Sequence, residues 1–349
     1  MDRFPAEIIA LVAAFLPLAA LREFRLVSRR LADVAYPILT QHLSVVNTAE
    51  CLEEFERFIH QDQLAARCVK RLTIYYGSWP VCTRDDWETH LLPLGGCHRM
   101  DVGRQRSHLA DQAYRDYRDF IRREGSREQS DLLVALRGLP NLRSIALAPL
   151  RASHHQQSQY SRLRKKIWLQ PYMKDSVSPT VTWVLGALNG FCQVRELEIK
   201  GNINPYDIEG PVRAEFIETL KISSLRCSDD QKLSRFLSSF GRIRELSLEM
   251  HDIVGGTAIP LDRVLWPNLE VLELTNARTS GISMASFIQR HTSLSVLRAR
   301  GTSMVGASWE SVLRDAQQRS IAGGAGAGAM ATQASWFLDA SSSHITWIR

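Results

Sequence analysis

The sequence lacks any pair of cysteines close enough to form a Cys-x-x-Cys motif. Six cysteines are spread along its 349 residues, at Cys51, Cys68, Cys82, Cys97, Cys192 and Cys227. A disulfide scaffold needs denser cysteines in a smaller chain, and the spacing of Cys82, Cys97 and His98 matches no usual zinc pattern. We therefore expect reduced thiols in a cytoplasmic and/or nuclear protein, with no metal ion and no cofactor.

A strong charge of either sign is also missing. The 43 basic and 37 acidic residues give a net charge of +6, and both signs alternate along most of the chain. Because nucleic-acid-binding proteins concentrate positive charge on one face, we expect a mixed solvated surface and no nucleic-acid partner. Residues 151–166 are the exception, since they are basic and contain no acid. They can be a weak nuclear-localisation or nucleic-acid patch, but we expect an exposed loop between strands.

The apolar run from Ile8 to Leu21 is only 14 residues long, too short to span a bilayer. Asp2 and Glu7 place negative charge where a signal peptide needs positive charge, and Pro17 interrupts the run. Its apolar residues are periodic, with Ile8, Val12, Phe15 and Leu16 on one helical face. This pattern predicts short amphipathic helices and neither secretion nor a membrane partner.

Motifs of catalysis are missing as well. The chain has no glycine-rich phosphate loop, no G-x-S-x-G elbow, no H-E-x-x-H and no kinase signature. Scattered Ser, His and Asp residues indicate nothing without geometry. We therefore expect a protein that is not an enzyme.

The first 45 residues do carry a clear pattern, that of three short helices. Pro5 and Glu7 suit a first helical turn, and Leu16-Pro17 ends that helix. A second helix is expected from about Ala19, and Ser28 can cap a third, which Pro37 ends or bends. Because so small a group of amphipathic helices buries little apolar surface alone, it is either a docking module or a cap on the next domain.

Residues 3–43 strongly resemble the F-box motif. The resemblance rests on Phe4-Pro5-Ala6-Glu7-Ile8, then Phe15-Leu16-Pro17-Leu18, then Leu21, then Arg25-Leu26-Val27-Ser28-Arg29-Arg30-Leu31. Phe4 replaces the usual leucine, Ala20 stands where an aspartate is common, and the tryptophan often found near residues 41–43 is missing. These departures leave the apolar face in place.

The resemblance implies docking on the Skp-type adaptor of an SCF-type ubiquitin ligase, and through it on a cullin-RING ligase. An F-box protein performs no chemistry itself and brings a bound protein substrate to the ligase. Carried over by position, the adaptor-binding residues are Pro5, Glu7, Ile8, Leu16, Pro17, Leu18, Leu21, Leu26, Val27 and Ser28.

An apolar-x-x-apolar-x-apolar pattern recurs through the rest of the chain. Its copies are Val69/Leu72/Ile74, Leu142/Ile145/Leu147, Val194/Leu197/Ile199, Ile217/Leu220/Ile222, Ile243/Leu246/Leu248, Leu269/Leu272/Leu274 and Leu294/Leu297/Ala299. The last five copies start 23, 26, 26 and 25 residues apart, and the step from Leu142 to Val194 is two such units. This is the leucine-rich-repeat period, with helices expected at 130–138, 229–241 and 283–291.

We therefore expect a mixed α/β fold, a small three-helix F-box followed by an irregular leucine-rich-repeat-like solenoid with a curved parallel sheet. An ordinary α/β domain with evenly spaced strands is the alternative. The expected domains are 1–45, then 46–321 with a helical insert at about 78–128, then 322–349 as a low-complexity link and terminal capping strand. A tyrosine-rich helix at about 107–123 and Leu139-Pro140-Asn141-Leu142 resemble F-box proteins of filamentous fungi.

A substrate is expected on the strand-lined face, where the x position of each L-x-L motif points. The candidate substrate-binding residues are Glu198, Lys200, Glu249, Glu273, Arg298 and Arg300. They suggest an unidentified protein partner with both charge signs. The expected function is the substrate-recognition subunit of an SCF-type ligase. The alternatives are an F-box protein acting outside ubiquitin ligation and a repeat scaffold whose helical start caps the solenoid.

Overall fold

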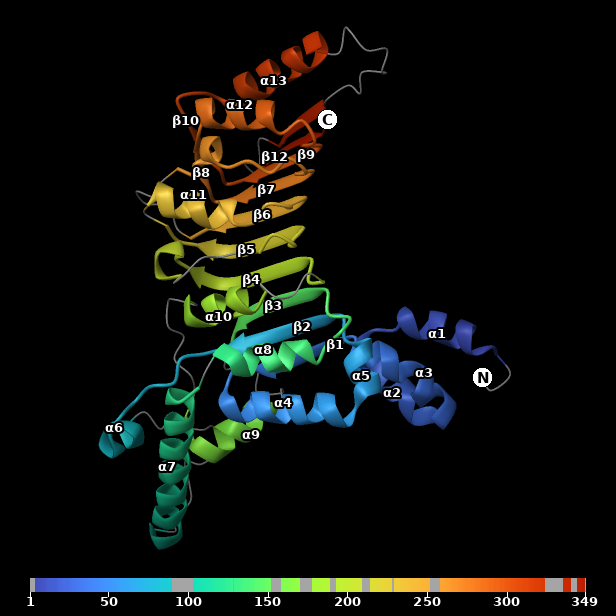
Figure 1. Ribbon diagram of the computed structural model, residues 1–349, viewed down its shortest axis with the longest axis vertical. Helices are drawn as coiled ribbons and strands as arrows, with labels where there is room; N and C mark the ends of the chain where they lie inside the picture. Colours follow the sequence, from blue (N-terminus) through green and yellow to red (C-terminus); the bar gives the residue numbers. More distant parts are fainter. Residues whose placement is uncertain are drawn as a thin grey trace. The chain divides into compact units, whose positions relative to one another are not determined.

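The structure is a computed structural model of a mixed α/β protein with mainly parallel strands (Figure 1), as expected. The chain divides into two compact units. The first comprises Met1–Leu142 and Leu147–Lys174, and the second Arg143–Ala146 and Asp175–Arg349. The structure describes residues 4–89, 103–127, 129–151, 158–169, 178–188, 193–208, 214–227, 229–251, 258–323, 335–339 and 344–348.

The first unit begins with the three expected helices, α1 (Ala6–Ala14), α2 (Leu18–Val27) and α3 (Arg29–Thr40). The Ser28 hydroxyl caps α3 by accepting a hydrogen bond from the Leu31 N–H at 3.3 Å, as expected. The helices enclose a small core of Ala13, Leu21 and Ala35, with Leu16 and Phe24 packed against it.

Pro37 was expected to end or bend α3, and the first of these two alternatives is wrong because Pro37 lies inside the helix. The helix continues to Thr40, although a proline inside a helix costs about 3 kcal/mol. The residues after Pro37 explain why, because Ile38 and Leu39 pack against the same core and the Thr40 hydroxyl donates to the Tyr36 carbonyl. Packing of this last turn therefore outweighs the lost hydrogen bond.

A parallel strand pair follows the helices. β1 (His42–Val46) pairs with β2 (Arg71–Tyr76), and α4 (Ala49–Gln61) and α5 (Gln63–Cys68) connect them. Helix α8 (Gln129–Arg137) contacts α4. The next residue after the helix is Gly138, where an added side chain would collide with Ile59. The expected helix at 130–138 is thereby confirmed.

The expected helical insert contains α6 (Arg84–Thr89) and the long helix α7 (Gly103–Gly125). Tyr117 and Phe120 on α7 form a buried cluster with Trp87, Leu163 and Ile167. The Tyr117 hydroxyl donates to the Pro80 carbonyl at 2.6 Å. The tyrosine-rich helix expected at about 107–123 is therefore part of α7, and its buried aromatic side chains hold the insert together.

The basic segment 151–166 is not simply a loop, which corrects that expectation. Residues 158–167 form helix α9 (Ser158–Ile167), and residues 152–157 lie outside the described ones. Tyr160, Leu163 and Ile167 fall on one helical face and are buried. On the other side, Arg162 and Lys166 form ion pairs with Glu54 and Glu50 of α4. The segment is therefore an amphipathic helix, which its high content of basic residues made hard to recognise from the sequence.

Strand β3 (Ser144–Pro149) contains residues of both units. In the second unit, β4 (Glu196–Ile203), β5 (Thr219–Leu225), β6 (Glu245–Met250), β7 (Val271–Thr275) and β9 (Val296–Arg300) pair in parallel in this order. All seven strands expected from the repeated apolar pattern are present. The 52-residue step between β3 and β4 contains α9 and α10 (Ser178–Leu188), and its described residues include no strand.

Helices cover one face of this sheet (Figure 1). They are α10, α11 (Asp230–Ser238) and α12 (Gly281–Arg290), with the short η2 (Pro205–Asp207) and η3 (Leu261–Arg263). Burial alternates along each strand, so Leu246 and Leu248 are buried while Glu245 and Glu249 are exposed. In the described part of the chain, the face away from the helices is therefore open and polar. Helices α11 and α12 confirm the helices expected at 229–241 and 283–291.

The end of the chain forms a hairpin where a single capping strand was expected. After α13 (Trp309–Gly323), β11 (Ser335–Asp339) pairs antiparallel with β12 (His344–Ile348), and β12 pairs antiparallel with β9. Ile345 and Trp347 are buried opposite Ala299 and Leu297. β8 (Arg278–Ser280) and β10 (Ser303–Val305) form a separate parallel pair. The low-complexity residues 324–331 lie outside the described ones.

Candidate functional site

Helix α1 has apolar side chains on two sides. On its inner side, Ile9 and Ala13 are buried, and Ala13 packs with Leu21 of α2 and Ala35 of α3. On its outer side and at its two ends, Phe4, Ile8, Leu11, Val12 and Phe15 are all exposed. Helical spacing places Ile8, Leu11, Val12 and Phe15 on one face, and Phe4 lies just before the helix, ahead of its N-cap Pro5. A helix that is apolar all round is normally buried all round, so the outer face lacks the cover that its composition calls for.

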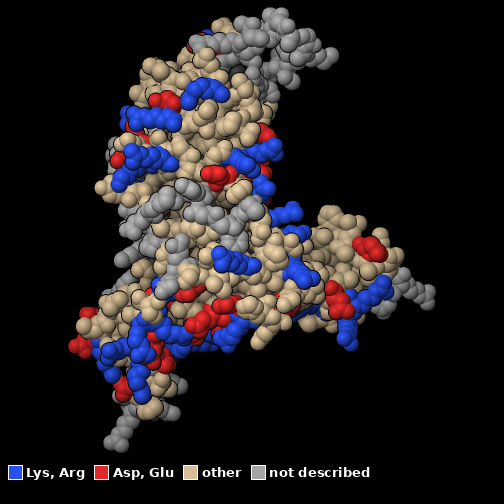
Figure 2. Space-filling view, in the orientation of Figure 1, with Lys and Arg blue, Asp and Glu red and all other residues tan. Residues whose placement is uncertain are grey.

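Helix α2 adds three exposed apolar side chains, Leu18, Leu26 and Val27. Val27 is 72% exposed and Phe15 82%, values unusual for such side chains in a folded unit. Figure 2 shows broad uncharged areas over α1–α3. We call the eight exposed residues the outer apolar face: Phe4, Ile8, Leu11, Val12, Phe15, Leu18, Leu26 and Val27. Apolar exposure on this scale is typical of an interaction surface.

The ten residues inferred from the F-box resemblance are divided between this face and the interior. Pro5, Glu7, Ile8, Pro17, Leu18, Leu26 and Val27 are exposed. Leu16 is partly buried, and Leu21 is only 2% exposed, so a partner cannot reach the Leu21 side chain in this structure. Ser28 is used as the cap of α3. The F-box motif did not single out Leu11 and Val12. The helical period of the sequence had already placed Val12 on one face with Ile8 and Phe15, and Leu11, three residues after Ile8, was missed although it falls on the same face.

The second candidate surface is the open face of the sheet in the second unit. The strand register aligns Glu198, Lys221, Ser247, Glu273, Arg298 and Thr346 in one row across it. Glu249, Thr275 and Arg300 are aligned in a neighbouring row, and Lys200 lies opposite Ser223. The six candidate substrate-binding residues therefore share this face, as their positions in the L-x-L motifs predicted.

Several of these charges pair with one another. Arg298 forms an ion pair with Glu273, and Lys200 lies 3.2 Å from a Glu198 carboxylate oxygen. Lys221 is exposed in the same row, and the sequence interpretation missed it although it occupies the x position of the Ile217/Leu220/Ile222 copy. Along the first row, acidic and basic side chains thus alternate at the charged positions, in the order Glu198, Lys221, Glu273 and Arg298.

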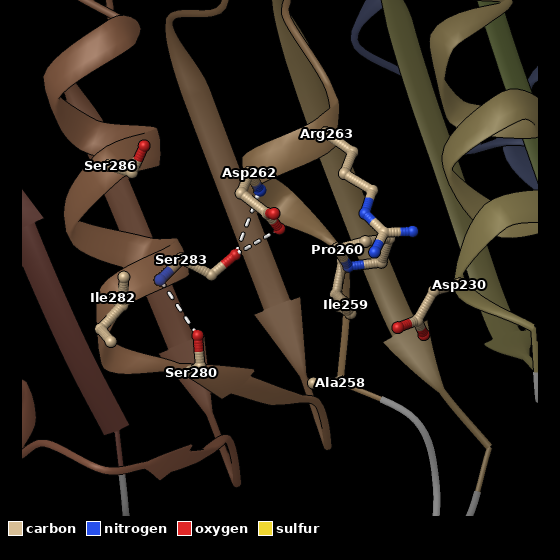
Figure 3. Close-up of a pocket in the computed structure, with 10 residues that line it drawn as sticks. All are labelled: Asp230, Ala258, Ile259, Pro260, Asp262, Arg263, Ser280, Ile282, Ser283 and Ser286. Carbon is tan, nitrogen blue, oxygen red and sulfur yellow. Dashed lines mark hydrogen bonds between the residues drawn. The ribbon is translucent and has the colours of Figure 1, made fainter.

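A pocket of about 350 Å³ lies beside the start of α12 (Figure 3). Asp262 and Ser283 point toward each other, and the Ser283 hydroxyl donates to the Asp262 carboxylate at 2.9 Å. The Ser280 hydroxyl accepts from the Ser283 N–H and caps the helix. These polar groups therefore serve to begin α12 and do not make a reactive set.

The described residues hold no group of three His, Cys, Asp or Glu side chains placed to bind a metal ion. No helix among them combines the length and the apolar character needed to cross a membrane. In comparisons with known proteins, no family model matches the chain and no curated protein matches its sequence. The geometry of the two surfaces therefore carries the functional argument.

Proposed function

We propose that this protein is the substrate-recognition subunit of an SCF-type ubiquitin ligase. In this proposal α1–α3 are an F-box, and the outer apolar face docks on the Skp-type adaptor and through it on a cullin-RING ligase. Helices bind such partners by burying apolar anchors in a groove. The observation that carries the proposal is the row of Ile8, Leu11, Val12 and Phe15, exposed on a helix whose other side is already packed, with exposed Phe4 just before it.

The second unit is proposed to be a leucine-rich-repeat-like domain that binds the protein substrate through its open strand face. Parallel strands spaced by 23 to 26 residues and an uncovered polar face support this assignment. We propose no catalytic role for the chain itself. Its contribution is to raise the concentration of the bound substrate near the ligase.

A different proposal has one specific observation in its favour. Leu21 is buried, and α3 contacts both α5 and β1, as expected if the helices simply cap a repeat scaffold. Full burial of Leu16, Leu21 and Val27 would have favoured that cap. The exposure of Val27 and of the α1 row favours docking instead.

The experiment is co-elution of the full chain with a purified Skp-type adaptor on size exclusion. The test variant is Leu11→Ser with Phe15→Ser, and the matched control is Leu265→Ser with Ile282→Ser, which replaces two exposed apolar side chains of the second unit. Circular dichroism checks that both variants fold. We expect co-elution of the wild type and the control but not of the test variant.

Failure of the wild type to co-elute would overturn the proposal in favour of the scaffold. If the adaptor binds, a ubiquitination assay with the reconstituted ligase distinguishes a substrate receptor from an F-box protein that acts outside ubiquitin ligation. A bound protein that gains ubiquitin marks a substrate receptor, whereas a bound protein that never gains it marks an F-box protein acting outside ubiquitin ligation.

A further inference from the structure

Helix α2 interleaves basic side chains with its exposed leucines. Leu18, Arg22 and Leu26 are spaced by four residues each, and Arg25 lies three residues from Arg22 and seven from Leu18, so all four belong to one helical face. All four are exposed. Glu23 is the one acid of α2 and lies on a different side of the helix, because neighbouring residues point in different directions.

These arginines have no acidic partner in the described part of the chain. Neither Arg22 nor Arg25 takes part in an ion pair there, and Arg29 at the start of α3 is exposed in the same way. Elsewhere in the first unit, arginines do find carboxylates, such as Arg123 with Glu53 and Arg162 with Glu54. Within the described part of the chain, Arg22 and Arg25 therefore leave positive charge without an ion pair beside the outer apolar face.

We propose that Arg22, Arg25 and Arg29 form a basic rim that selects a protein partner whose docking surface carries carboxylates next to an apolar groove. This inference rests on the proposed docking function and adds to it the charge of the partner. Charges at the edge of an interface mainly accelerate association and reject partners of like charge. The rim thus acts on the rate of encounter, while the apolar residues resist dissociation.

An anionic membrane is the other surface that fits a helix with apolar and basic residues. Two features favour a protein. Arg22 lies between Leu18 and Leu26 on one face, so leucines inserted into lipid would draw this arginine down with them. Helix α1, which with its flanking residues Phe4 and Phe15 carries five of the eight residues of the outer apolar face, has Glu7 and no basic residue.

The test measures association and dissociation rates between the full chain and a purified Skp-type adaptor. Rates are taken from about 50 mM to about 500 mM NaCl, a range over which screening becomes strong. The rim variant is Arg22→Glu with Arg25→Glu. The control is Arg226→Glu with Arg235→Glu, which reverses two exposed charges of the second unit that lie outside the row of candidate substrate-binding residues. In parallel, binding of the full chain to vesicles of phosphatidylcholine with phosphatidylserine is measured without the adaptor.

For the rim variant we expect association at low salt to slow by about tenfold or more, with the loss shrinking at high salt and little change in dissociation. The control should match the wild type. Equal rates for rim variant and wild type would overturn the rim while leaving adaptor docking intact. No adaptor binding by the wild type would overturn both proposals, and adaptor-independent binding to the anionic vesicles would replace them with a membrane surface.

Discussion

At the scale of single residues, a left-handed backbone recurs at the strand ends of the second unit. Gly201, Ser224, Asn276 and Gly301 have positive φ angles, each two residues after the second buried residue of its L-x-L pair. At Gly301 the constraint is double, because an added Cβ would also come within 2.6 Å of the Asn276 side-chain oxygen. The turn after β9 therefore needs glycine for both conformation and space.

Gly301→Ala should lower the free energy of unfolding by more than Gly306→Ala. Gly306 has the same left-handed backbone but open space around it, so its substitution reports the backbone cost alone, about 1–2 kcal/mol. Urea titration of both variants measures the difference. Equal losses would mean that the contact with Asn276 costs nothing.

His291 is a buried residue whose protonation state matters for stability. Its Nε2 accepts from the Trp266 N–H at 2.9 Å, and its Nδ1 lies 2.8 Å from the Phe287 carbonyl, which assigns the proton to Nδ1. Burial holds the pKa of His291 below its usual value of 6.5. Protonation would remove the acceptor that the Trp266 amide needs.

The His291 pKa is lower in the folded than in the unfolded chain, so the stability contributed by neutral His291 is present above pH 6.5 and is lost as the pH falls below it. His291→Ala should cost about 2–4 kcal/mol at pH 7.5, from the unpaired amide and the cavity. The gap between wild type and variant should narrow at pH 5, as measured by urea unfolding. A gap that is independent of pH would contradict this account of His291.

Residue types alone could not separate the two faces of the first helices. The F-box resemblance placed Leu21 and Val27 in one set, but Leu21 is buried and Val27 is exposed. Which of two apolar residues faces inward depends on how α1, α2 and α3 pack, and that information is not local. Ser28 was predictable because a cap needs only its own hydroxyl and the next helical turn.

At the scale of elements, the strands were predictable and helix α9 was not. The repeated apolar positions are buried because successive side chains of a strand point to opposite faces of the sheet. This alternation does not depend on the neighbouring sequence, so it can be recognised from the sequence alone. In α9, four basic residues separate Tyr160, Leu163 and Ile167, and the net charge concealed the helical spacing. The β11–β12 hairpin was only partly predictable, because the link before it carries no pattern.

Apolar packing should hold α9 in place more strongly than its ion pairs do. Leu163 is buried in the aromatic cluster of α6 and α7, whereas Arg162 pairs with Glu54 while largely exposed. We expect Leu163→Ala to cost about 2–5 kcal/mol and Arg162→Ala about 1 kcal/mol or less. Guanidinium unfolding compares the two variants, and a larger loss for Arg162→Ala would contradict this ranking.

At the scale of the whole molecule, the two units offer surfaces of different chemistry. The first unit exposes apolar side chains on α1 and α2, and the second exposes polar and charged ones on its open strand face. Such a division suits a protein that holds one partner permanently and meets another transiently, because apolar interfaces are typical of lasting complexes. The sequence predicted where both surfaces lie along the chain. Which apolar residues of α1 and α2 are exposed on the outer apolar face depends on how the three helices pack, and the sequence did not predict that.

The most direct test of the proposed docking is amide hydrogen exchange of the full chain, alone and with a saturating Skp-type adaptor. We predict slower exchange in α1 and α2 on binding, with β4 to β9 unchanged, because only the helices would be covered. Binding that left α1 and α2 unprotected, or that protected the open strand face instead, would contradict the assignment of the outer apolar face as the docking surface.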